Sequence, residues 1–75
     1  MVLLTNIIEI INIVLKNRGK DEMKIINESS SLREDIGFDS LDLAELTVRI
    51  EAEYEVDIFE DGIVNTVGEI LEKIK

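Results

Sequence analysis

The sequence contains no cysteine, histidine, proline or tryptophan, and only two phenylalanines and one tyrosine. Without cysteine, disulfides cannot stabilise the fold, and without cysteine or histidine the usual ligands of a structural zinc site are missing. The absence of histidine also removes the usual general base of a serine catalytic triad. The lack of proline, together with abundant isoleucine, leucine, glutamate and lysine, favours helices that pack through aliphatic side chains.

The length and the charge narrow the class of protein further. We expect residues 1–75 to form a single domain, close to the lower size limit for a stable core. Seventeen acidic residues against eight basic ones give a formal net charge of −9. Such a charge repels nucleic acid and anionic membrane surfaces, and it attracts proteins with basic patches. We therefore expect protein partners, no binding to nucleic acid or membranes, and a monomer.

The N-terminal segment is strongly apolar and resembles a signal peptide or a membrane span at first sight. It carries Asn6, Glu9 and Asn12, has no basic residues before the apolar stretch, and is too short to cross a bilayer. Its apolar residues recur at helical spacing, with the polar ones gathered on the opposite side. We interpret residues 3–16 as a helix that packs on the core.

A long connection without a periodic pattern follows, over residues 17–38. A connection of this length in so small a domain indicates a functional loop, or a loop held by its own side chains. The side chains expected to hold it are all apolar: Met23, Ile25, Ile26, Leu32 and Ile36.

A second helix is predicted over about residues 39–54. Asp39 suits the N-cap position, and Asp42, three residues later, completes an acidic variant of the capping box. The expected buried stripe consists of Leu43, Leu46, Thr47, Ile50 and Tyr54, and the charged residues expected to lie away from it are Asp42, Glu45, Arg49, Glu51 and Glu53.

The C-terminal part of the chain predicts one more main helix. It begins at Asn65 or Thr66, because Thr66 and Glu69 have the spacing of a capping box. A turn is expected at residues 60–62, with a short helical turn nearby. The sequence therefore predicts an all-α fold with three main helices and a long first connection.

Ser40 is the residue whose position carries most functional information. It falls in the first turn of the second predicted helix, where we expect its hydroxyl to be exposed. The serine is not part of a Gly-x-Ser-x-Gly elbow, and the chain offers no histidine to activate it. A chain this short is also poorly able to enclose a pocket that would shift the pKa values of a pair of carboxylates for catalysis. We therefore expect a substrate of another enzyme, and neither a catalyst nor a dedicated metal site.

The second helix also offers a surface for a partner. Its acidic side chains supply charge for steering, and Leu41, Ala44 and Val48 supply a small apolar border for docking. A solvated face beside ordinary surface aliphatics explains the helix equally well.

The segment LREDIGFDSLD, residues 32–42, resembles the attachment site of acyl carrier proteins. That family typically has a leucine or phenylalanine, an acidic pair, an aliphatic residue and a glycine, followed by Asp-Ser-Leu. The similarity continues at residues 43–46, 50–51, 53–54, 56, 58 and 66–70, so it extends over nearly the whole chain.

The resemblance implies a four-helix bundle with a short third helix. It implies that a phosphopantetheinyl transferase, using coenzyme A and Mg²⁺, joins 4′-phosphopantetheine to Ser40 Oγ, and that the thiol of this arm carries acyl groups as thioesters in the cytoplasm. A carrier for fatty-acid or polyketide synthesis is favoured over an aminoacyl or peptidyl carrier, and an unmodified acidic adaptor remains the alternative. The residues expected to contact the transferase and acyl-handling enzymes with basic docking patches are Asp39, Leu41, Asp42, Glu45, Val48 and Glu51.

Three positions depart from the family pattern. Arg49 places a positive charge where carriers of primary fatty acid synthesis tend to have a small or acidic residue, and Phe59 replaces a frequent proline. Phe38 is a bulky residue just before the attachment pair, and we expect it to shelter the start of the arm. These departures favour a specialised carrier.

Overall fold

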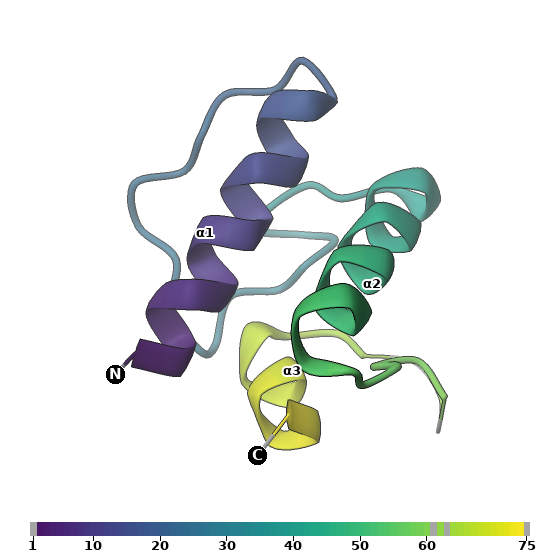
Figure 1. Ribbon diagram of the computed structural model, residues 1–75. Helices are drawn as coiled ribbons and strands as arrows, with labels where there is room; N and C mark the ends of the chain where they lie inside the picture. Colours follow the sequence, from purple (N-terminus) through teal and green to yellow (C-terminus); the bar gives the residue numbers. More distant parts are fainter. Residues whose placement is uncertain (1, 61, 63, 75) are drawn as a thin grey trace.

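The computed structural model describes residues 2–60, 62 and 64–74, and this part of the chain contains three α-helices and no strand. They are α1 (Val2–Asn17), α2 (Ser40–Tyr54) and α3 (Val67–Ile74). α1 packs against both α2 and α3, and the short α3 lies near the N-terminal end of α1 and the C-terminal end of α2 (Figure 1). The prediction of an all-α fold with three main helices is confirmed. No helix within the described residues is long and apolar enough to cross a membrane.

α1 contributes one apolar side to the core, as its sequence pattern predicts. Ile7, Ile11, Val14 and Leu15 are buried, and Leu3, Leu4, Ile8 and Ile10 pack around them in partly buried positions. These side chains recur three or four residues apart, so they share one face of the helix. The predicted helix over residues 3–16 is confirmed, with its ends displaced by one residue.

The connection between α1 and α2 runs back along α1 before it enters α2 (Figure 1). The amide of Asn12 fixes its path, because Asn12 Oδ1 accepts a hydrogen bond from the Met23 N–H at 2.9 Å and Asn12 Nδ2 donates one to the Met23 carbonyl at 3.3 Å. Ile26, Leu32 and Ile36 are buried and Met23 is partly buried, as expected. The prediction for Ile25 is wrong, since its side chain is 80% exposed. Adjacent side chains of a non-helical segment point to different sides, and here Ile26 takes the inward position.

The same connection also holds the start of α3. Ser31 and Thr66 form an isolated antiparallel bridge, and the Leu32 N–H donates to the Asn65 carbonyl at 2.8 Å. The Gly68 N–H donates to the Glu28 carbonyl at 2.8 Å, and a Cβ atom at Gly68 would lie 3.0 Å from that oxygen. Glycine therefore allows the close approach of α3 to the connection. At the start of α3, Thr66 Oγ1 accepts from the Glu69 N–H at 3.2 Å, as the capping-box spacing predicts.

The segment between α2 and α3 is less regular than the resemblance implies. Residues 58–60 form a turn, and no described residue between Glu55 and Thr66 is helical. Ile58 and Val64 are buried and attach the segment to the core. The predicted turn at residues 60–62 includes Asp61, which lies outside the described residues, as does Ile63. The short third helix, and with it the four-helix bundle, is therefore not confirmed.

The C-cap of α2 is Glu55, whose φ of 59° and ψ of 34° are left-handed. Non-glycine residues are strained in this region, and a carboxylate is also unfavourable at the negative end of a helix. We therefore expect Glu55→Gly to raise the free energy of unfolding by about 0.5–1 kcal/mol, measured by urea denaturation. Glu53→Gly, within α2, is the control and should lower it by about 1 kcal/mol. A loss of stability in Glu55→Gly would contradict this expectation.

Candidate functional site

Ser40 is the first residue of α2, and its side chain is exposed, as predicted. The residue before it caps the helix: Asp39 Oδ1 accepts from the Asp42 N–H at 3.0 Å, and Asp42 Oδ2 accepts from the Asp39 N–H at 3.0 Å. This reciprocal pair is the capping box that the sequence predicts, and it fixes where α2 begins. The hydroxyl of Ser40 is consequently held at a defined helix end and remains open to solvent.

Asp42 does not lie where the sequence places it. We expected it on the exposed side of α2, but its side chain has 0% exposure. Lys20 Nζ lies 2.6 Å from Asp42 Oδ2. Arg18 Nε lies 2.7 Å from Asp42 Oδ1. The Arg18 N–H does not point at this oxygen, so the second contact is an ion pair without a hydrogen bond. Residues 18 and 20 follow α1 directly and fold over the start of α2. The carboxylate therefore cannot contact a partner protein directly.

We refer to Arg18, Lys20 and Asp42 as the ionic clasp. Burial raises the pKa of Asp42, but hydrogen bonds from Lys20 and from the Asp39 backbone, with the charges of Lys20 and Arg18, outweigh burial and hold this pKa below its usual value. Lys20 Nζ also donates to the Gly37 carbonyl at 3.1 Å, and Arg18 Nη2 lies 3.8 Å from Asp39 Oδ2. The clasp thus ties the end of α1 to both sides of Ser40.

Phe38 does not have the predicted role. Its side chain is part of the buried core, and its N–H donates to the Leu32 carbonyl at 2.8 Å. It therefore cannot shelter a group on Ser40, and the expectation is wrong. A large apolar side chain gains more free energy in the core of a small domain than on its surface. Its burial anchors the residues just before Ser40.

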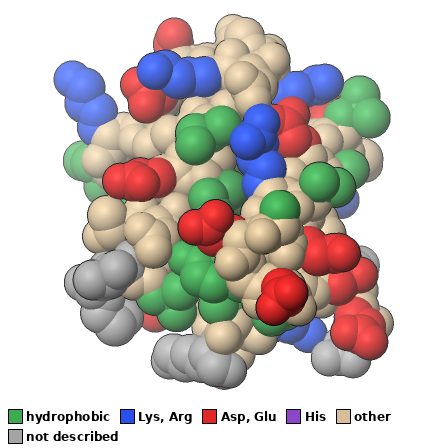
Figure 2. Space-filling model, viewed as in Figure 1, with side chains coloured by type: hydrophobic (Ala, Val, Ile, Leu, Met, Phe, Trp, Pro, Cys, Tyr) green, Lys and Arg blue, Asp and Glu red, His purple; other side chains and the backbone are tan. Residues whose placement is uncertain are grey.

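The remaining predicted contact residues lie on the outer side of α2. Leu41 and Val48 are 64% and 66% exposed, and Asp39 and Glu51 are also exposed. Glu45 is only partly exposed: hydrogen bonds from Asn17 at 3.1 Å and from Arg49 at 3.0 Å hold its carboxylate and lower its pKa. Figure 2 shows further acidic side chains around the C-terminal end of α2 and the segment after it. This side of α2 therefore combines acidic groups with two exposed aliphatic ones.

A groove of about 270 Å³ borders Ser40. Its other lining residues come from three parts of the chain: Arg33, Leu43, Ala44, Thr47 and Phe59. Arg33 is not among the predicted site residues, because the connection that contains it has no periodic pattern from which the direction of its side chain follows. Phe59 stood out only as a departure from the family pattern.

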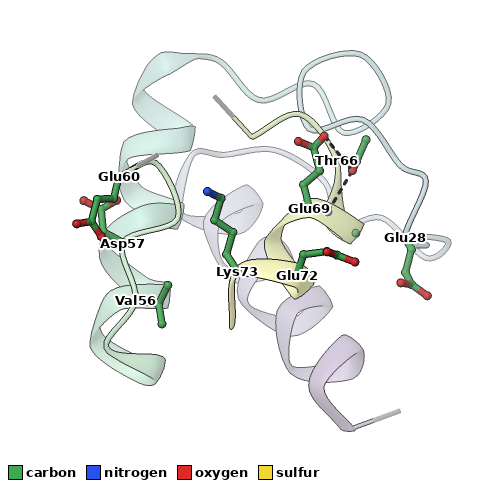
Figure 3. A pocket seen from close by; sticks show the side chains of 9 residues that line it. Glu28, Val56, Asp57, Glu60, Thr66, Glu69, Glu72 and Lys73 are labelled. Atoms are coloured by element: carbon green, nitrogen blue, oxygen red, sulfur yellow. Dashed lines mark hydrogen bonds between the residues drawn. The ribbon is translucent and has the colours of Figure 1, made fainter. Parts of the chain in front are cut away.

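A larger hollow lies elsewhere, between α3 and the segment after α2, and Ser40 does not line it (Figure 3). It has a volume of about 830 Å³, and most of its lining residues are charged: Glu28, Asp57, Glu60, Glu69, Glu72 and Lys73. Within the described part of the chain, no group of three or more acidic side chains is arranged to hold a metal ion. The groove beside Ser40 is therefore the more relevant one for chemistry at the serine.

Ser40 is thus an exposed serine at the capped start of α2, in a small acidic helical protein without histidine. A family model described as phosphopantetheine attachment site matches residues 5–74, and the chain belongs to this family. The chain is also similar to the acyl carrier protein of Chlamydia caviae, with 36% identity over 66 residues that cover 85% of this chain and 84% of the relative. Members of the family are carriers and not enzymes, and their prosthetic group is covalently attached 4′-phosphopantetheine.

Proposed function

We propose that Ser40 is the attachment site and that this chain carries acyl intermediates as thioesters in fatty-acid, polyketide or related biosynthesis in the cytoplasm. The observation that carries the proposal is the exposure of Ser40 at the first position of α2, beside a groove and between the anchored residues Phe38 and Asp42. The serine stands within the Asp-Ser-Leu sequence through which the chain resembles its family.

The residues around Ser40 fit a phosphodiester. From sequence alone, Asp39 and Asp42 oppose a phosphate at this position. In the structure, the carboxylates of Asp39 and Asp42 form ion pairs with Arg18 and Lys20. These cations reduce the negative electrostatic potential at Ser40, so a phosphate is repelled less than the sequence alone indicates. The positive end of α2 adds a favourable term of about 0.3–1 kcal/mol for a negative group at its first turn. When attached, the arm supplies the thiol that this cysteine-free chain lacks.

The outer side of α2 is the surface that we propose for partners. A carrier of this family interacts with a phosphopantetheinyl transferase and with acyl-handling enzymes. Leu41 and Val48 lie seven residues apart, about two helical turns, and are suited to apolar contacts across one face. Asp39, Glu45 and Glu51 are suited to basic patches. Asp42 contributes indirectly, by holding the start of α2 in place.

The proposed function is tested with coenzyme A, Mg²⁺ and a phosphopantetheinyl transferase of broad specificity. Intact mass spectrometry of the incubated protein should show one phosphopantetheine increment. The new thiol should then accept an acyl group as a thioester. If a known carrier is modified under the same conditions and this protein keeps its original mass, the unmodified adaptor is the better description.

The acidic side chains of α2 should affect how fast the transferase finds the protein. We expect Glu45→Lys to slow modification by about two- to tenfold at low ionic strength, with a smaller effect at high salt, because steering by exposed charge is screened. Glu72→Lys, on α3, makes the same change of charge away from α2 and is the control. Equal rates for Glu45→Lys and the unchanged protein at low salt would exclude steering by Glu45.

A further inference from the structure

The groove beside Ser40 contains one charged lining side chain among the described residues, that of Arg33. Arg33 belongs to the connection before α2, seven positions ahead of Ser40, and the two residues border the same groove. Leu43, Ala44, Thr47 and Phe59 make up the rest of the lining. The hydroxyl of Thr47 is bonded to the Leu43 carbonyl at 2.8 Å, so it is already satisfied within α2. The groove is therefore largely apolar, with a cation and Ser40 on its border.

Arg33 differs from the other arginines in having no acidic partner. Arg18 pairs with Asp42 and Asp39, and Arg49 pairs with Glu45. The side chain of Arg33 is exposed, and the structure gives it no carboxylate within 4.0 Å among the described residues. In a chain with seventeen acidic residues, an arginine beside the candidate attachment site without such a partner is available for another anion.

We propose that the guanidinium group of Arg33 binds the phosphate of the phosphopantetheine arm on Ser40. This inference rests on the proposed function and specifies how the chain holds the arm. Guanidinium groups bind phosphate oxygens through two parallel N–H donors, which makes arginine well suited to this contact. The phosphate would be joined directly to Ser40 Oγ, and Ser40 lines the same groove as Arg33. A volume of about 270 Å³ is just below the range of small-molecule pockets, about 300–1,000 Å³, so the groove suits the beginning of the arm and not a long acyl chain.

The contact gives the arm a preferred direction. Leu43 and Ala44 line the same groove, so they are the apolar surface that the first atoms of the arm would meet while Arg33 holds the phosphate. An exposed pair of this kind shifts the equilibrium between the held and the released arm by about two- to fivefold, and added salt weakens it. Arg33 therefore restrains the arm without locking it.

The test uses the modified forms of the unchanged protein, Arg33→Gln and Lys24→Gln, each shown by intact mass to carry one arm. Lys24 is exposed, makes no ion pair with a described residue and does not line the groove, so Lys24→Gln removes the same charge elsewhere. Phosphorus-31 NMR should give a narrower phosphodiester line in Arg33→Gln than in the unchanged protein, and an unchanged line in Lys24→Gln. High salt should narrow the line of the unchanged protein toward that of Arg33→Gln.

A second measurement does not depend on a variant. In the unchanged protein, the Nε–H resonance of Arg33 should shift when the arm is attached, and the shift should shrink with added salt. Equal phosphorus lines in Arg33→Gln and the unchanged protein, or equal narrowing in both variants, would overturn the inference. Because each sample is first shown to carry the arm, failure of modification contradicts the proposed function, whereas an unaffected phosphate contradicts only the role of Arg33.

Discussion

Asp42→Asn is expected to lower the free energy of unfolding by about 3 kcal/mol at neutral pH, measured by urea denaturation. Removing one member of a buried ion pair leaves its partners without compensation, which typically costs about 3–5 kcal/mol. The side chains of Arg18 and Lys20 are 34% and 37% exposed, so water partly compensates them and the expected loss falls at the lower end. A domain of this size has little stability to lose, and much of the protein should unfold.

Glu45→Gln is the matched control for Asp42→Asn. It removes the same charge from the same helix and also breaks an ion pair, between Glu45 and Arg49. That pair is more exposed, so the expected loss is below about 1 kcal/mol. Similar losses of stability in the two variants would contradict the structural importance of the ionic clasp.

The effect of Asp42→Asn should also depend on pH. The pKa of Asp42 in the folded protein lies below its usual value of about 4, so the unfolded chain binds the proton more readily. The stability gained from the carboxylate is therefore present above pH 4 and is lost as the pH falls through the folded pKa. Urea denaturation at a series of pH values should show that the difference in unfolding free energy between Asp42→Asn and the unchanged protein becomes smaller below pH 4. A constant difference down to strongly acidic pH would contradict this origin.

Ser40→Ala is expected to abolish modification completely while the protein stays folded. The variant removes the only atom to which the transferase can join the phosphate at this position. Because the Ser40 side chain is exposed and alanine favours helices, the free energy of unfolding should change by less than about 0.5 kcal/mol. Intact mass spectrometry and urea denaturation of the same preparation measure both effects.

Ser29→Ala is the control for Ser40→Ala. Ser29 is also exposed but lies in the connection before α2, where its hydroxyl donates only to Asn27 Oδ1. This variant should gain one phosphopantetheine increment like the unchanged protein. A folded Ser40→Ala protein that still gains the increment would place the attachment site on another hydroxyl.

Local signals in the sequence were sufficient to predict the three helices and the position of Ser40 at the start of α2. The capping box of α2 needs only Asp39 and Asp42, which are three residues apart, so the start of the helix follows from neighbouring residues. The apolar periodicity of α1 likewise identified the side that packs on the core. Both patterns lie within the sequence of one helix, so they can be read without knowledge of the tertiary structure.

Contacts between distant parts of the chain could not be predicted from these local patterns. Asp42 is buried because Lys20, 22 positions away, reaches it from the connection after α1. Nothing in the pattern of α2 indicates this partner, and a carboxylate normally avoids burial unless it is paired. The direction of the Ile25 side chain and the position of Arg33 could not be predicted for a similar reason. Individual hydrogen bonds hold the long connection against α1 and α3, and its sequence has no repeating pattern that would indicate them.

Attachment of the arm to Ser40 is tested most directly by locating the modification within the chain. The sequence offers four serines and three threonines, so an intact mass alone does not identify the hydroxyl. Tandem mass spectrometry of the modified protein should place the phosphopantetheine increment on every fragment that contains Ser40 and on no fragment that lacks it. An increment on a fragment that contains Ser29, Ser30 or Ser31 but not Ser40 would contradict attachment at the start of α2.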